Sequence, residues 1–98
     1  MQNEEKEIIK LSMQELIVLF FNTIAGRCWA RLGLTRDEYG ELRQDLREAR
    51  MGIDVLDAVL KVIEDDLDED LKRELEAVLA NLKLNYVNQY SKAKEAKT

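Results

Sequence analysis

The stretch "DLREARMGIDVLDAVLKVIE", residues 45–64, decides the fold. Its apolar side chains recur every three or four residues, which predicts an α-helix over the whole range. Two apolar stripes run along this helix, one more than packing against a single neighbour requires. The first consists of Leu46, Ala49, Ile53, Leu56, Leu60 and Ile63, and the second of Met51, Val55, Ala58, Val59 and Val62. At about 100° per residue the apolar arc covers roughly 220°, so the polar face is narrow.

The preceding segment, residues 12–32, predicts a helix of the same kind. Ser12 and Glu15 have the spacing of a capping box at its start, and Gly33 supplies a left-handed stop at its end. One apolar stripe is Met13, Ile17, Phe20, Ile24 and Cys28, and the arc is widened by Phe21, Ala25, Trp29 and Leu32. Residues 1–11 are expected to form either a short helix or an arm.

A third helix is predicted over residues 68–91, followed by a polar, basic tail at 92–98. It begins inside "EDDLDEDLKRE", residues 64–74. Asp68 is placed to cap the helix, and acids in a first turn favour the positive end of the helix dipole. The apolar stripe follows the same three-or-four spacing: Leu71, Leu75, Val78, Leu79, Leu82 and Tyr86. Helix initiation therefore explains this acidic stretch without a ligand.

An alternative function for residues 64–70 is metal-dependent or carboxylate-based chemistry. Its candidate residues are Asp65, Asp66, Asp68 and Asp70. Three of these acids alternate, as in a calcium-binding EF-hand loop that starts at Asp66. The sixth position of such a loop should be glycine but is Leu71, and the twelfth should be glutamate but is Ala77. The pattern does not favour a specific calcium site.

Composition limits the fold and the chemistry. The 98 residues are the size of one domain, with no proline and four glycines, which favours an all-α fold over a turn-rich β fold. The sequence has no histidine, the commonest general base and metal ligand. We therefore expect no enzyme activity, no cofactor and no metal.

Charge disfavours general binding to phosphate. The formal net charge is −5, and the arginines between residues 27 and 50 alternate with carboxylates. No DNA partner is expected, and an RNA or ribonucleoprotein adaptor remains a second alternative. Within the same region, Thr35 and Glu38 have capping-box spacing, which predicts one helical turn before a connector that contains Gly40.

Three side chains of the 12–32 helix have competing interpretations. Trp29 suits a core or dimer face better than a partner anchor. Cys28 is better explained as a buried, inert thiol than as a nucleophile. Arg31 falls on the apolar side and needs a partner if it is buried, so we expect a structural ion pair with Asp54 or Asp57.

The sequence predicts a cytoplasmic protein. The N-terminal "MQNEEKEIIK" is acidic and polar, unlike a signal peptide. The longest apolar run, "LIVLFF" at residues 16–21, is far shorter than the ~20 residues of a membrane span. A single cysteine suits a reducing compartment.

Together these patterns predict an all-α, three-helix bundle: two long antiparallel helices plus a first apolar helix. A lone bundle would leave a contiguous apolar patch exposed, and such patches mark interfaces. We expect the chain to act through association, as a homodimer or as an accessory subunit of an unknown protein, and not at a membrane. The interface candidates are Phe21, Ala25, Trp29, Met51, Val55, Val59 and Val62.

Four short segments resemble a bacterial family catalogued as domain of unknown function 1844. They are "ARLGL" at 30–34, "DLREA" at 45–49, "IDVL" at 53–56 and "LKLNYV" at 82–87. The resemblance covers about residues 16–88 and implies a helical fold with no assigned activity. The chain departs from the family at the second turn, where "IEDDLD" at 63–68 replaces a Gly-Asn pattern, and its connector lacks the usual prolines.

Overall fold

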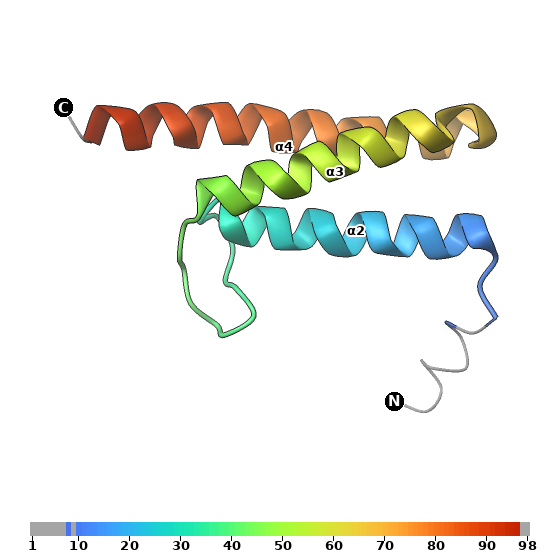
Figure 1. Ribbon diagram of the computed structural model, residues 1–98, viewed down its shortest axis with the longest axis horizontal. Helices are drawn as coiled ribbons and strands as arrows, with labels where there is room; N and C mark the ends of the chain where they lie inside the picture. The colour runs from blue at the N-terminus through green and yellow to red at the C-terminus, as the bar shows by residue number, and fades with distance from the viewer. Residues whose placement is uncertain (1–7, 9, 97–98) are drawn as a thin grey trace.

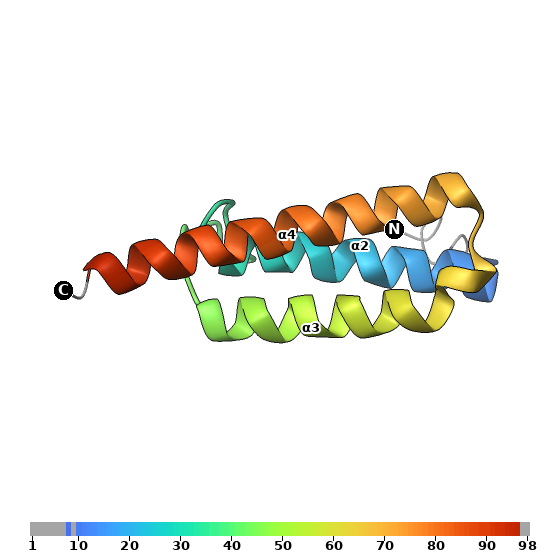
Figure 2. The same cartoon turned by 90° about the horizontal axis from the view of Figure 1, so that it is seen from above.

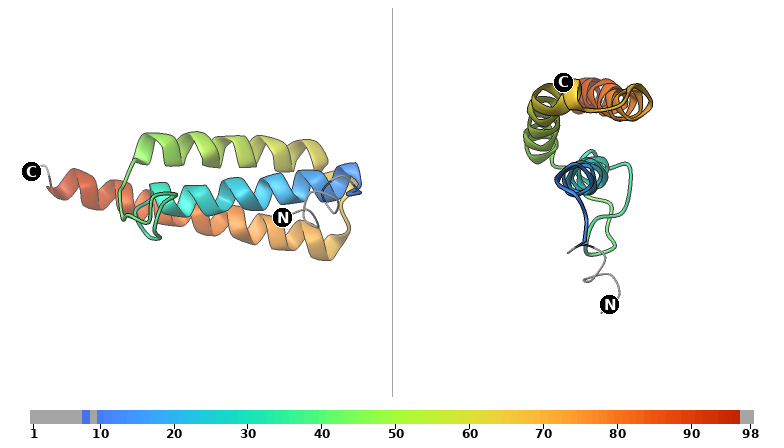
Figure 3. Two further views of the ribbon diagram at one scale, coloured as in Figure 1. Left: turned by 90° about the horizontal axis from the view of Figure 1, so that it is seen from below. Right: turned by 90° about the vertical axis from the view of Figure 1, so that its right-hand side faces the viewer.

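The computed structural model describes residues 8 and 10–96, and these form a bundle of three long α-helices. The helices are α2 (Met13–Arg31), α3 (Leu46–Ile63) and α4 (Glu69–Ala96), with a 3-10 turn, η1 (Glu64–Asp66), between the last two. The chain runs up and down, so that α3 is antiparallel to α2 and α4 (Figure 1). The views from above, from below and end on show the three helices running along the long axis of the molecule (Figures 2 and 3). The predicted all-α, three-helix bundle is confirmed.

Side-chain caps start all three helices where the sequence predicts them. The Ser12 hydroxyl accepts from the amide of Glu15 at 3.1 Å, and the Glu15 carboxylate accepts from the Ser12 amide in return. Asp45 caps α3 and Asp68 caps α4, each accepting the amide three residues later, at 3.1 Å and 2.8 Å. Such caps each stabilise a helix by about 1 kcal/mol, so the helix starts are encoded locally.

Gly33 ends α2 as predicted. It adopts a φ of 81°, a backbone conformation that residues with a Cβ rarely adopt. Its amide donates to the Ala30 carbonyl at 3.0 Å, and the Leu34 amide donates to the Trp29 carbonyl at 3.2 Å. These two bonds form a Schellman motif, which satisfies carbonyls that the helix end would leave unpaired.

The core consists of one face from each helix. Its buried members are Phe21, Ala25, Cys28 and Leu32; Ala49, Ile53, Leu56 and Leu60; and Leu75, Leu79 and Leu82. The α3 residues all belong to the first predicted stripe. Helix α2 packs mainly against α3, and α3 also packs against α4. Of the second α3 stripe, only Val59 packs against the core, and Met51, Val55, Ala58 and Val62 are exposed.

Helices α2 and α3 approach each other closely at Gly52. A Cβ built on Gly52 would lie 2.5 Å from the Cys28 Sγ atom and 3.6 Å from Ile24 Cγ2. Only a residue without a side chain allows this approach. From this end the two helices diverge toward the start of α2 and the end of α3 (Figure 1). The divergence opens the surface described below.

Helix α4 continues to Ala96, beyond the predicted end at residue 91. The added residues include Lys92, Ala93 and Lys94, which are good helix formers, so helical structure extends into the segment predicted as a polar tail. Residues 97 and 98 of that segment lie outside the described residues. So do residues 1–7 and 9, which make up most of the predicted N-terminal arm.

Candidate interaction surface

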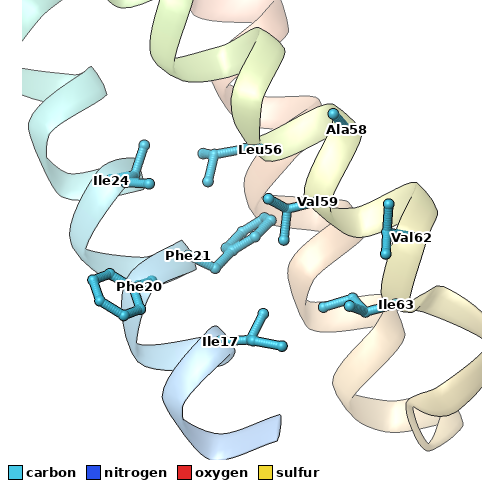
Figure 4. Close-up of a pocket in the computed structure, with 9 residues that line it drawn as sticks. All are labelled: Ile17, Phe20, Phe21, Ile24, Leu56, Ala58, Val59, Val62 and Ile63. Carbon is cyan, nitrogen blue, oxygen red and sulfur yellow. The ribbon is translucent and has the colours of Figure 1, made fainter. Parts of the chain in front are cut away.

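An apolar groove of about 420 Å³ lies between the diverging parts of α2 and α3 (Figure 4). We call it the α2–α3 groove. Helix α2 lines it with Ile17, Phe20, Phe21 and Ile24. Helix α3 lines it with Leu56, Ala58, Val59, Val62 and Ile63. Every one of these side chains is a hydrocarbon, so the groove offers a ligand no hydrogen-bonding group and suits an apolar partner.

The two neighbouring phenylalanines of α2 have opposite roles. Phe21 points toward α3 and is 1% exposed, whereas Phe20 turns away from it and is 60% exposed (Figure 4). Consecutive helical residues are about 100° apart, so one of the two must leave the core. Met13, on the same stripe as Phe20, is also exposed.

Helix α3 presents a second exposed apolar row next to the groove. This row, which we call the α3 seam, consists of Met51, Val55, Ala58 and Val62. Val62 is 78% exposed and Met51 is 60% exposed. The seam and the groove are contiguous, since Ala58 and Val62 belong to both. Contiguous apolar surface of this kind is typical of an interface.

The structure divides the seven interface candidates into three groups. Phe21 and Ala25 are buried in the core of the chain itself. Trp29 and Val59 are partly buried against that core. Met51, Val55 and Val62 are exposed on the α3 seam. On α2 the exposed large apolar side chains are instead Met13, Leu19 and Phe20, none of which sequence reasoning selected.

Arg31 forms an ion pair, but the predicted partners Asp54 and Asp57 are wrong. Its guanidinium binds both carboxylate oxygens of Glu38, at 2.7 and 2.8 Å, and its Nε donates to Glu48. The bond from Arg31 lowers the pKa of Glu38 to about 2. Asp57 instead binds Lys83 at 2.9 Å, which lowers the pKa of Asp57, and it also contacts Lys61 at 3.0 Å.

The connector between α2 and α3 is built around Asp37, which sequence reasoning missed. Its carboxylate accepts from the amides of Tyr39 and Glu41 and from Arg43 Nε, each at 2.9 Å. The Asp37 side chain is only 1% exposed. The Glu41 amide is the main cause of a pKa lowered to about 2 for Asp37. The signal in the sequence was the "DEYG" pattern, an Asp that can bond the following amides before a turn glycine.

The predicted helical turn and its Thr35–Glu38 capping box are therefore wrong. Residues 33–45 form turns, bends and irregular loop instead. The Glu38 carboxylate is bound by Arg31 and by Arg27, so it is not available to cap a helix start. Gly40, with a φ of 75°, closes the turn by donating its amide to the Asp37 carbonyl at 2.9 Å.

We expect the unfolding free energy to fall as pH drops from about 4 toward 2. The folded-state pKa of Asp37, about 2, lies below the ordinary value near 3.9. Its contribution is thus complete above the ordinary pKa and is lost as pH falls through the folded value. Urea unfolding at a series of pH values checks this. The unfolding free energy of the Asp37→Asn variant should fall less steeply over that pH interval. An unchanged slope would contradict the assignment of this pH dependence to Asp37.

The basic residues of the 27–50 region are largely engaged by acids. Arg27 binds Glu38, Arg43 binds Asp37 and Glu41, and Arg50 lies 3.9 Å from Asp54. Charges neutralised in this way contribute little to phosphate binding.

The acidic stretch starts a helix. Asp68 caps α4, while Asp65, Asp66 and Asp70 point into solvent. Among residues 8 and 10–96 there is no group of three or more His, Cys, Asp or Glu side chains placed to share a metal ion.

Cys28 lies in the core. It is 2% exposed, its Sγ lies 3.9 Å from the Ala49 carbonyl oxygen, and burial raises its pKa. A thiol with a raised pKa and little exposure reacts slowly, so the prediction of a buried Cys28 is confirmed.

Comparison with family models gives a match over most of the chain. The model of a family described as a domain of unknown function (DUF1844) matches residues 13–88, which span all of α2 and α3 and most of α4. No curated protein matches the chain, and no solved structure matches it. Over the part of the chain that the structure describes, no helix is both long and apolar enough to cross a membrane.

Proposed function

Because the chain belongs to the DUF1844 family, whose description assigns no activity, we propose a function from its exposed surface: protein association through the α2–α3 groove and the α3 seam. The observation that carries this proposal is the exposure of Phe20, Met51 and Val62 around one hydrocarbon groove. Leaving such surface in water is unfavourable by roughly 25 cal/mol per Å², so covering it with another protein supplies the driving force.

The chemistry of the groove favours a helical protein partner over a small polar ligand. Its lining offers apolar side chains from two helices and no hydrogen-bonding group. An amphipathic helix needs such a surface and brings no unsatisfied backbone groups, because its own amides and carbonyls are bonded internally. The reducing cytoplasm is the compartment we propose, and the single, buried cysteine supports it.

A photo-crosslinking amino acid at position 62 tests the proposal. Val62 lies in both the groove and the seam, so a probe there should form a covalent adduct of one defined mass in extract of the native host. The matched control is the same probe at Arg73, which is exposed on α4 and lies outside the groove and the seam. If neither position, or both equally, gave adducts, the proposed function would be overturned.

A further inference from the structure

The α3 seam has the spacing of a helix–helix contact. Its four residues are separated by four, three and four positions, the alternation by which one helix presents a straight apolar row to another. All four are exposed in the single chain. The partner of such a row is a helix that carries a complementary row.

The seam is complementary to itself. Met51 and Val62 are equally distant from the midpoint between Leu56 and Asp57, and so are Val55 and Ala58. If two copies of α3 lie antiparallel about a twofold axis at this midpoint, Met51 faces Val62 of the second copy, and Val55 faces Ala58. A larger side chain then meets a smaller one at each level, which favours close packing. We propose that a second copy of this chain covers the α3 seam in this antiparallel register, an inference that rests on the proposed function.

The charges beside the seam complement each other in the same register. Asp54 and Lys61 lie on one edge of the seam, and both side chains are 71% exposed. A twofold axis between antiparallel helices brings the same edges together, so Asp54 of each copy lies near Lys61 of the other, offset by two positions, or roughly 3 Å along the helix axis. In a parallel pair this edge would meet Gly52 and Val59 instead, without a complementary charge. The charges thus select the antiparallel orientation.

Acidic residues at both ends disfavour a shifted register. Glu48 and Asp65 continue the seam's spacing before Met51 and after Val62. Sliding one copy by seven residues would place Glu48 against Ala58 or Asp65 against Val55, which would desolvate a carboxylate. In the symmetric register Glu48 of each copy faces Asp65 of the other at the open ends of the contact, where both carboxylates stay exposed to water and Glu48 is already paired with Arg31 of its own chain.

The opposite edge of the seam extends the contact to α2. Val59 and Gly52 on that edge face α2 of their own chain. The twofold axis brings the two α2–α3 grooves to the same side of the pair, each bordered by the exposed Phe20 of its own chain.

Cysteine pairs test orientation and register together. An oxidised equimolar mixture of Met51→Cys and Val62→Cys chains should form a mixed disulfide dimer, because the two positions lie opposite each other. Neither variant alone should crosslink with itself, since each position would be offset from its own copy by about 16 Å along the axis. The native Cys28 is buried and does not compete.

A charge exchange measures the edge contacts. Asp54→Lys and Lys61→Asp should each weaken dimerisation by about tenfold, because each creates two like-charge contacts per dimer. The dimer dissociation constant of the double variant should return to within about threefold of that of the unmodified chain. If the double variant dimerised as weakly as the single variants, the proposed register would be overturned.

Light scattering over a wide concentration range separates this inference from the proposed function. A mass of twice 11.4 kDa that responds to the charge exchange supports the antiparallel pair. A monomer at all concentrations, or a disulfide from Met51→Cys chains alone, overturns it. If the monomer still forms a position-62 adduct with another protein, the proposed function stands without the second copy. If it forms none, both are wrong.

Discussion

Phe21→Ala should lower the unfolding free energy by about 3–5 kcal/mol, the largest effect we expect from one side chain. Phe21 is 1% exposed and packs in the core with Leu56, so truncation removes buried surface and leaves a cavity. Side-chain caps fix the ends of the surrounding helices, and α2 and α3 are already in close contact at Gly52. Both features limit how far the helices can move to fill that cavity. Urea unfolding followed by circular dichroism gives the change as a shift in midpoint.

The neighbouring Phe20→Ala is the matched control. The same atoms are removed one position earlier, but Phe20 is 60% exposed in the single chain. At protein concentrations too low for association, the unfolding free energy of the Phe20→Ala variant should differ from that of the unmodified chain by less than about 1 kcal/mol. At high concentration the loss should increase if Phe20 is covered by a partner. Equal losses for both variants at low concentration would show that the assignment of inner and outer faces on α2 is wrong.

The helix starts could be predicted from sequence because their chemistry is local. Ser12 and Asp68 each act on an amide three residues away, and Gly33 acts within its own turn. The core face of α3 could also be predicted from sequence, because its first stripe is continuous over the whole helix. These features depend on residue type and spacing alone.

The inner face of α2 could not be predicted in the same way. Both of its stripes are apolar, so periodicity does not distinguish Phe20 from Phe21. The choice is made by a tertiary contact, the packing of Phe21 and Ala25 into one core with residues of α3 and α4. No pattern within residues 12–32 encodes that contact, which is why the interface candidates on α2 include buried residues.

The connector was misjudged because its charges act over longer distances. Arg31 binds Glu38, seven residues later, and Glu48, seventeen residues later, so the loop folds back on the end of α2. Sequence reasoning placed the partners of Arg31 on the middle of α3. Once Arg31 holds Glu38, the neighbouring Asp37 is free to organise the turn through the backbone amides of Tyr39 and Glu41.

Gly52→Ala should lower the unfolding free energy by about 1–3 kcal/mol, although alanine is the better helix former. The added Cβ would lie 2.5 Å from Cys28 Sγ, in the core, so the helices must move apart. The change would also widen the α2–α3 groove from its narrow end. Urea unfolding gives the stability, and the reaction rate of Cys28 with a thiol reagent reports the separation of the helices.

Gly26→Ala is the control that isolates this contact. Gly26 also lies inside a helix, but a Cβ there meets nothing within 4 Å. Alanine should therefore stabilise the chain at this position by about 0.5–1 kcal/mol, through helix propensity alone. The two substitutions are chemically identical and should differ in sign. If both stabilised the chain, α2 and α3 would not meet at Gly52, and the divergence of the helices that forms the groove would need another cause.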